Sequence, residues 1–171
     1  TWHAEAQTQA RETGVTLLEG SVFYGDLTQS PWYAYLGKEY IDFAPFYSFI
    51  PYNDPLNKQY FRPLAQDTAS AGFQNKNILS EFSLFRTDST NSHDQQLNNF
   101  AYEFIYRFKL PNANNFKIGA SYINNINKTQ SGLENLSATG NTHLPAIDIN
   151  AFLTWQPFNL IGEYDSTLKR V

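Results

Sequence analysis

The sequence predicts an all-β fold: an antiparallel up-and-down transmembrane β-barrel, with about eight strands in this chain. Three observations predict it. Polar and apolar residues alternate with a period of two, aromatic residues make up 16% of a chain with a mean hydropathy of -0.46, and short connections alternate with long ones. Such alternation is typical of strands that face lipid on one side and a wet lumen on the other. No apolar run approaches the ~20 residues of a membrane helix.

The expected strands are short segments separated by turn residues. In chain order they cover residues 16–24, 32–43, 68–74, 78–86, 100–110, 116–125, 147–155 and 158–168. The first has an apolar face on its even positions. The second carries aromatic residues on both faces, so its orientation stays open. Residues 1–11 are expected to form a solvated loop.

The segment 100–110 is the clearest strand. Its even positions are all large and apolar, namely Phe100, Tyr102, Phe104, Tyr106, Phe108 and Leu110. Its odd positions include Glu103 and Arg107, which suit a wet lumen. A soluble sandwich rarely needs so many large apolar residues on one strand face, whereas a barrel wall in lipid does. Turn sequences at 111–115 and 156–157 join the last four strands into two hairpins.

The lengths of the connections alternate along the chain. The short ones cover 25–31, 75–77, 111–115 and 156–157, and the long ones 44–67, 87–99 and 126–145. Outer-membrane barrels have short periplasmic turns and longer outside loops. With eight strands, this topology puts both chain ends outside, where complete barrels do not have them. The prediction is therefore one partial barrel domain over residues 1–171, with both end regions of the full protein missing.

Composition excludes several function classes. The net charge is -4 and there is no cysteine. Nucleic-acid binders carry a basic face, so nucleic acid is not an expected partner. Thiolate catalysis and cysteine-bound zinc are excluded, and no phosphate loop or Ser/His/Asp spacing occurs. We expect no enzyme, no catalytic or metal site and no cofactor.

Two groups of residues are candidates for binding or lining a pore. The first consists of charged residues on the expected lumen face: Glu103, Arg107, Lys117, Asp148, Glu163 and Asp165. Rings of charge set selectivity in pores, but this mixed set predicts neither an anion nor a cation. These residues could also neutralise one another inside a filled barrel.

The second group lies in the long connection 44–67, which is rich in aromatic residues and proline. Its candidate residues are Tyr52, Lys58, Tyr60 and Arg62. Long loops of this kind usually have a function, so this one is expected to fold inward as a constriction or to bind a ligand at the mouth. Lys58 and Arg62 are the candidates for an anionic chelate, which they would bind through charge-assisted hydrogen bonds.

Several segments resemble a known family. They are the runs 32–43 (WYAYLGKEYIDF), 119–126 (GASYINNI), 145–149 (PAIDI) and 157–164 (PFNLIGEY). In this order they resemble the LbtU-type siderophore porin family, related to the FupA/FslE iron-uptake proteins, over residues 12–168. The resemblance implies a bacterial outer-membrane barrel, in contact with outer-membrane lipid, that takes up a ferric siderophore or iron. Asp42 stands where that family's pattern has proline, so the solute stays open.

Two other functions remain open. The chain could belong to a surface structural or adhesion barrel without specific transport, and dependence of iron uptake on the protein would separate that function from a porin. It could also be a soluble, lipocalin-like ligand-binding barrel. That fold would place aromatic residues inside and charges outside. The oligomeric state is not predicted.

Overall fold

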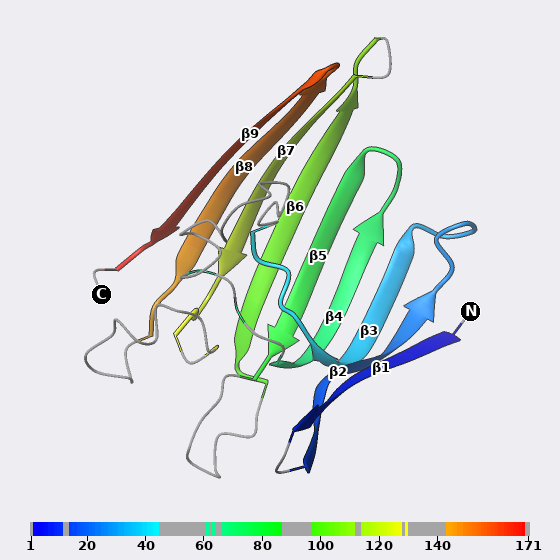
Figure 1. Ribbon diagram of the computed structural model, residues 1–171, viewed down its shortest axis with the longest axis vertical. Coiled ribbons are helices and arrows are strands. Elements are labelled where there is room, and N and C mark those ends of the chain that lie inside the picture. Colours follow the sequence, from blue (N-terminus) through cyan, green and yellow to red (C-terminus); the bar gives the residue numbers. More distant parts are fainter. Residues whose placement is uncertain are drawn as a thin grey trace.

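The computed structural model describes residues 2–11, 14–44, 61, 63, 66–86, 97–111, 114–127, 129 and 143–169. Its strands are β1 (Trp2–Arg11), β2 (Gly14–Gly25), β3 (Trp32–Glu39), β4 (Gln66–Gln74), β5 (Ile78–Phe85), β6 (Asn99–Lys109), β7 (Asn115–Ile123), β8 (Ala146–Trp155) and β9 (Phe158–Thr167). All nine lie in one sheet in sequence order, each antiparallel to the next (Figure 1). The antiparallel up-and-down prediction is confirmed, although these strands do not close into a barrel.

The predicted strand number was too low by one. Residues 2–11, expected to be a solvated loop, form β1, which pairs with β2 along its length. The segment is rich in Ala, Gln and Thr and has few large apolar residues, so its composition does not show the usual strand pattern. Pairing with β2 satisfies its backbone groups on one side, and this long-range interaction outweighs the weak local signal.

The connections alternate in length as predicted from β2 onward. Short connections at 26–31, 75–77, 110–114 and 156–157 meet at one end of the sheet. The other end carries the long connections 40–65, 86–98 and 124–145. The β1–β2 connection, residues 12–13, is an exception because it is short and lies at the long-loop end. Within the described residues, no helix has the length and apolar character needed to cross a membrane.

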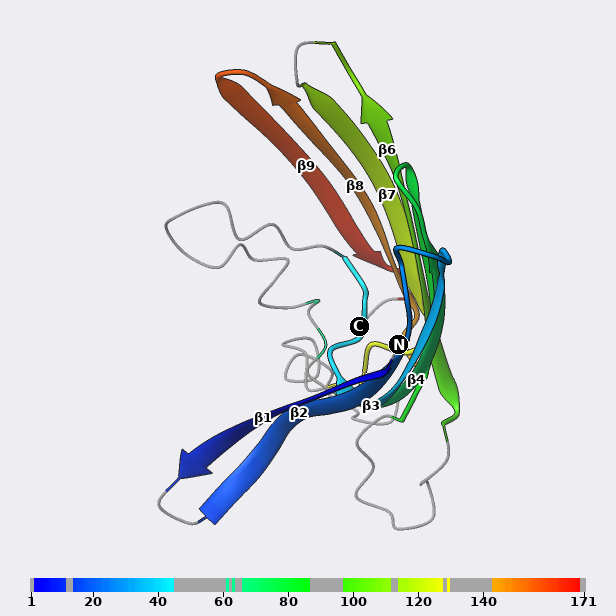
Figure 2. The same ribbon diagram turned by 90° about the vertical axis from the view of Figure 1, so that its right-hand side faces the viewer.

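The sheet is curved, with a concave and a convex face (Figure 2). Residues 40–44 lie on the concave side. Side chains alternate between the two faces: Ile149 on the convex face is 52% exposed, whereas its neighbours Asp148 and Asn150 are 0% and 2% exposed. The prediction that β6, β7, β8 and β9 each have an apolar face opposite a polar one is therefore confirmed. The sequence left the orientation of β3 open. In the structure, Trp32 and Leu36 lie on the convex face and are exposed, and Tyr33 and Tyr35 lie on the concave face.

Most aromatic residues on the convex face lie toward one or the other end of their strands, in two bands, whereas Phe104 and Tyr106 of β6 lie between the bands. The short-turn band consists of Trp2, Tyr24, Trp32, Phe73, Phe108, Phe116, Trp155 and Phe158, and the long-loop band of Phe82, Phe100, Tyr102 and Tyr122. Rings within each band contact across strands, as in Trp32–Phe73 and Phe82–Phe100, with centroids 5.0 and 5.9 Å apart. From the rise of a strand, Tyr102 and Phe108 lie roughly 20 Å apart along β6.

The apolar core is small and lies on the concave side at the long-loop end. It consists of Ile41, Phe43, Ala44, Phe85, Ala101, Ile123, Ile126, Leu144 and Ala146, with Phe61 packed against it. The strand residues among them come from the ends of β5 to β8 that adjoin the long connections. This core anchors residues 40–44 to the sheet and so places the segment beside the polar part of the concave face.

Candidate functional site

Four carboxylates lie in one row across the concave face. Glu81 of β5 pairs with Glu103 of β6, and Asp148 of β8 pairs with Asp165 of β9. Ser121 of β7 lies between Glu103 and Asp148 in the same row. We call Glu81, Glu103, Asp148 and Asp165 the carboxylate belt. Burying carboxylates side by side is unfavourable because each loses hydration and repels the next, so this row points to a functional role.

Two tyrosines of β3 hold one end of the belt. The hydroxyls of Tyr33 and Tyr35 each donate a hydrogen bond to a different carboxylate oxygen of Glu81, both at 2.5 Å. Tyr33 spans β4 to reach Glu81 because Gly72 lies between them, and a Cβ there would overlap the Tyr33 ring. The position of Glu81 is therefore set by residues from two neighbouring strands, β3 and β4.

Residues 40–44 lie against the belt. The backbone N–H of Ala44 donates to Ser121 Oγ at 3.4 Å, and Phe43 is fully buried. The Asp42 side chain is partly exposed, yet loss of hydration among the surrounding protein atoms, followed by the charge and hydrogen bonding of Glu81 and the charge of Glu39, raises its pKa to about 7. Near neutral pH, Asp42 therefore exchanges a proton while it is packed against Glu81.

The strand predicted over 32–43 ends earlier, at Glu39. After it the chain turns onto the concave face, and Ala44 adopts a left-handed backbone conformation with φ 59°. That conformation is uncommon for a residue with a Cβ, so the path of the segment is imposed by its packing and not by local preference. Residues 40–44 thus lie on the concave side, whereas most of the connection 44–67 is outside the described residues, so its arrangement as a constriction or a ligand-binding loop stays a prediction.

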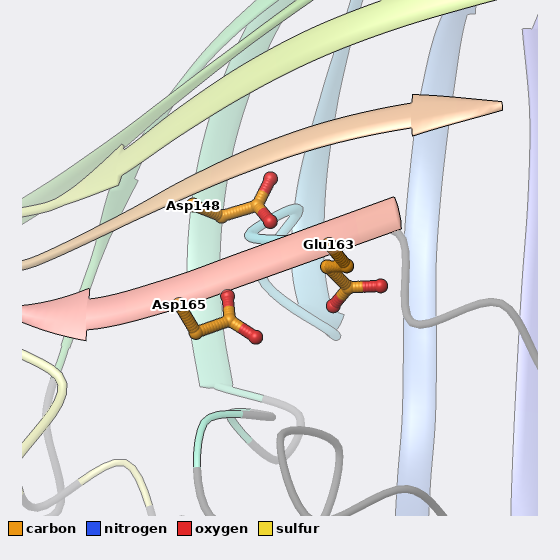
Figure 3. A group of neighbouring side chains, drawn as sticks. All are labelled: Asp148, Glu163 and Asp165. Carbon is orange, nitrogen blue, oxygen red and sulfur yellow. The ribbon is translucent and has the colours of Figure 1, made fainter. Parts of the chain in front are cut away.

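The other end of the belt carries a group of three carboxylates. Asp148 projects from β8, and Glu163 and Asp165 from β9 (Figure 3). One oxygen from each lies within 4.8 Å of the others. Asn150 Nδ2 donates to Asp148 Oδ2 at 2.6 Å, which orients that carboxylate. Carboxylate oxygens at this spacing are ligands for hard cations, so of the described residues these are the ones that could hold one.

The six charged residues that the sequence placed on the lumen face all lie on the concave face. The structure separates the acidic ones from the basic ones. Glu103, Asp148 and Asp165 are in the belt, and Glu163 is beside it. Arg107 pairs with Lys117 across β6 and β7, four residues further toward the short-turn end than Glu103, or roughly 13 Å along the strand. Lys117 Nζ lies 5.4 Å from the centroid of the Phe152 ring. The lining is thus acidic at the belt and basic nearer the short turns, rather than evenly mixed.

The four candidates of the long connection, Tyr52, Lys58, Tyr60 and Arg62, lie outside the described residues. Their proposed role in binding an anionic chelate stays a prediction.

Sequence reasoning missed Glu81, Asp42 and the two tyrosines. Glu81 could have been assigned to the charged face, because it alternates with Phe82 and Leu84 in a segment that was predicted as a strand. The two tyrosines could not be assigned to a face, because β3 is aromatic on both faces. Asp42 lies at the start of a connection whose path depends on contacts with distant strands.

Comparison with protein-family models, with curated proteins and with solved structures finds no match for this chain. The resemblance to the LbtU-type siderophore porins therefore stays a prediction.

Proposed function

We propose that this chain forms part of the wall of a bacterial outer-membrane β-barrel that takes up a small solute, iron or a ferric siderophore. The observation that carries the proposal is the polarity of the sheet. Large apolar side chains such as Leu36, Phe82, Ile149 and Tyr164 are exposed on the convex face, whereas Ser83, Glu103 and Asp148 are buried on the concave face. In water this arrangement is unfavourable on both faces, and in a bilayer it is favourable on both.

The two aromatic bands support the same proposal. Outer-membrane barrels carry aromatic girdles at both interfaces, on either side of an apolar band ~25 Å tall. The spacing of roughly 20 Å along β6 is close to that height. A soluble lipocalin-like barrel is disfavoured, because it needs its aromatic residues inside and its charges outside.

The carboxylate belt favours a cationic solute. Rings of Asp and Glu attract cations and repel anions in pores. Of the two solutes that the resemblance implies, the belt therefore suits an iron cation better than an anionic ferric chelate. A specific acidic lining also favours transport over a purely adhesive barrel, whose lumen needs no particular charge.

Arginine substitutions at two adjacent residues of β6 test the membrane part of the proposal. Phe104 is on the convex face between the aromatic bands, and Ile105 is in the concave set. In the full-length protein, Phe104→Arg should reduce assembly into lipid vesicles, because arginine near mid-bilayer costs ~2–4 kcal/mol on the lipid face. Ile105→Arg, the matched control, should assemble far better. Greater damage from Ile105→Arg would mean that the faces are inverted and would overturn the proposal.

Uptake is tested separately, with vesicles that contain the assembled full-length protein. Radiolabelled ferrous iron should enter these vesicles faster than vesicles without protein, and Glu103→Gln should slow its entry. Equal entry with and without the protein would reject iron uptake while leaving the barrel intact.

A further inference from the structure

A pocket on the concave side lies between the first strands and residues 40–44. Its volume is about 360 Å³, and its walls include Phe23, Tyr35, Glu39, Tyr40 and Asp42. That volume lies in the range of small-molecule sites. The pocket is separate from the group formed by Asp148, Glu163 and Asp165, which comes from the opposite edge of the sheet.

The walls of this pocket carry negative charge. Glu39 and Asp42 both line it, and the described lining residues include neither lysine nor arginine. Ser21 Oγ donates a hydrogen bond to Glu39 Oε1, which holds that carboxylate at the wall. Asp42 is further crowded by Glu81, just beyond the pocket. Carboxylates packed this closely repel one another, and a positive charge between them stabilises both.

The remaining walls are aromatic and held in place. Phe23 stacks on Tyr33, with centroids 5.7 Å apart and an interplanar angle of 19°. The hydroxyl of Tyr35 is bonded to Glu81 at 2.5 Å. Aromatic rings attract cations through their π faces and also provide apolar surface for carbon atoms. Because these rings are held by neighbouring residues, binding would cost little conformational entropy.

We infer that this pocket binds a small organic cation of the alkylammonium class. Glu39 and Asp42 neutralise its charge, and Phe23, Tyr35 and Tyr40 contact its carbon atoms. A bare metal ion fits less well, since calcium or magnesium needs about six or more close oxygen ligands and makes no use of aromatic walls. Binding does not depend on the proposed transport, because the described walls of the pocket come from β1 to β3 and residues 40–44 alone.

The titratable groups that line the pocket or act on Asp42 are His3, Tyr33, Tyr35, Glu39, Tyr40, Glu81 and Glu103. Asp42 must be ionised to neutralise the ligand. Since the pKa of Asp42 is raised to about 7, affinity should increase as the pH rises through about 7.

The test is a calorimetric titration of the full-length protein in detergent micelles with choline chloride. The control ligand is 3,3-dimethyl-1-butanol, the neutral carbon isostere of choline. Choline should bind with saturation and the isostere should not. Glu39→Gln should weaken choline binding about tenfold, and Asp26→Asn, which removes one negative charge in the turn between β2 and β3, less than twofold. Phe23→Leu, which keeps every carboxylate, should weaken binding severalfold.

Three results would overturn the inference: equal binding of the neutral isostere, equal loss of affinity in Glu39→Gln and Asp26→Asn, or a saturable response to magnesium chloride with none to choline. If Glu39→Gln does not fold, as judged by circular dichroism, the Phe23→Leu variant decides: unchanged choline binding in that variant also overturns the inference. Failure of choline binding leaves the barrel proposal standing, because membrane assembly is measured independently.

Discussion

At the scale of single residues, the concave face depends on glycines that make room for side chains from neighbouring strands. Gly72 lets Tyr33 cross β4 to Glu81, and Gly119 accommodates Asn150, whose Oδ1 would lie 2.7 Å from an added Cβ. Gly162, on β9, has nothing within 4 Å of such a Cβ. These glycines therefore differ in role although all three are in strands.

Gly72→Ala should destabilise the protein by about 1–3 kcal/mol, because the added methyl displaces Tyr33 and weakens its hydrogen bond to Glu81. The matched control is Gly162→Ala, which should be neutral or slightly stabilising, since its methyl meets no neighbour and restricts the unfolded chain. Urea unfolding of the full-length protein in micelles measures both. Equal effects of the two substitutions would show that the space around Gly72 does not matter.

At the scale of elements, residues 40–44 are held against the sheet by a contact that depends on protonation. The pKa of Asp42 is about 7 in the folded protein and near 3.8 in an unfolded chain. A carboxyl whose pKa is raised by folding binds its proton more tightly in the folded state. Its contribution is therefore most favourable below pH 4 and is lost as the pH rises through about 7.

Hydrogen exchange of the Phe43 and Ala44 amides should reveal this dependence. After correction for intrinsic exchange rates, their protection should fall between about pH 5 and pH 8 in the wild type. Asp42→Asn, which cannot ionise, should show nearly constant protection over the same range. A wild type with the same pH profile as Asp42→Asn would exclude Asp42 as the responsible group.

The carboxylate belt is the second element with a measurable consequence. If it lines a pore, neutralising one of its charges should lower cation selectivity. Glu103→Gln should reduce the cation-to-anion permeability ratio roughly two- to threefold, the effect of one charge several ångströms from an ion in a wet pore. The measurement is the reversal potential of the full-length protein in a planar bilayer under a salt gradient. Asp26→Asn removes the same charge at an exposed turn but keeps an acceptor for Thr28, so it should leave the ratio unchanged. Equal shifts in both variants would assign selectivity to net charge and not to the belt.

At the scale of the whole molecule, the proposed outer-membrane barrel predicts the depth at which the tryptophans of the convex face would lie in lipid. All three tryptophans, Trp2, Trp32 and Trp155, are in the short-turn band, and they are 70%, 65% and 57% exposed. Tryptophan prefers the headgroup level of a bilayer. The three should therefore lie together near one interface.

Brominated lipids can measure that depth. In vesicles containing the full-length protein, bromine near the headgroups should quench tryptophan fluorescence more strongly than bromine near the bilayer centre. Acrylamide in the water phase serves as a reference for exposure to solvent. Stronger quenching by deep bromine would place the tryptophans near the bilayer centre and contradict their expected position at the interface. No quenching by either lipid would reject contact with the bilayer.

Much of the fold could be predicted from local patterns. The hairpins β6–β7 and β8–β9, and the faces of their strands, follow from alternation, because a period of two assigns each side chain to one face once the strand is known. The alternation is weak where both faces are aromatic, as in β3, or where large apolar residues are scarce, as in β1. In those strands, pairing with neighbours determined the structure.

Local sequence patterns were enough to predict the all-β fold class, the order of most strands and the separation of an aromatic face from a charged one, because these depend on neighbours along the chain. Which charged residues meet depends on the tertiary structure. The row from Glu81 to Asp165 arises from registers across β5 to β9, and the packing of Asp42 against Glu81 arises from the inward path of residues 40–44. Register and loop path result from contacts between residues far apart in the chain, and no single segment contains that information.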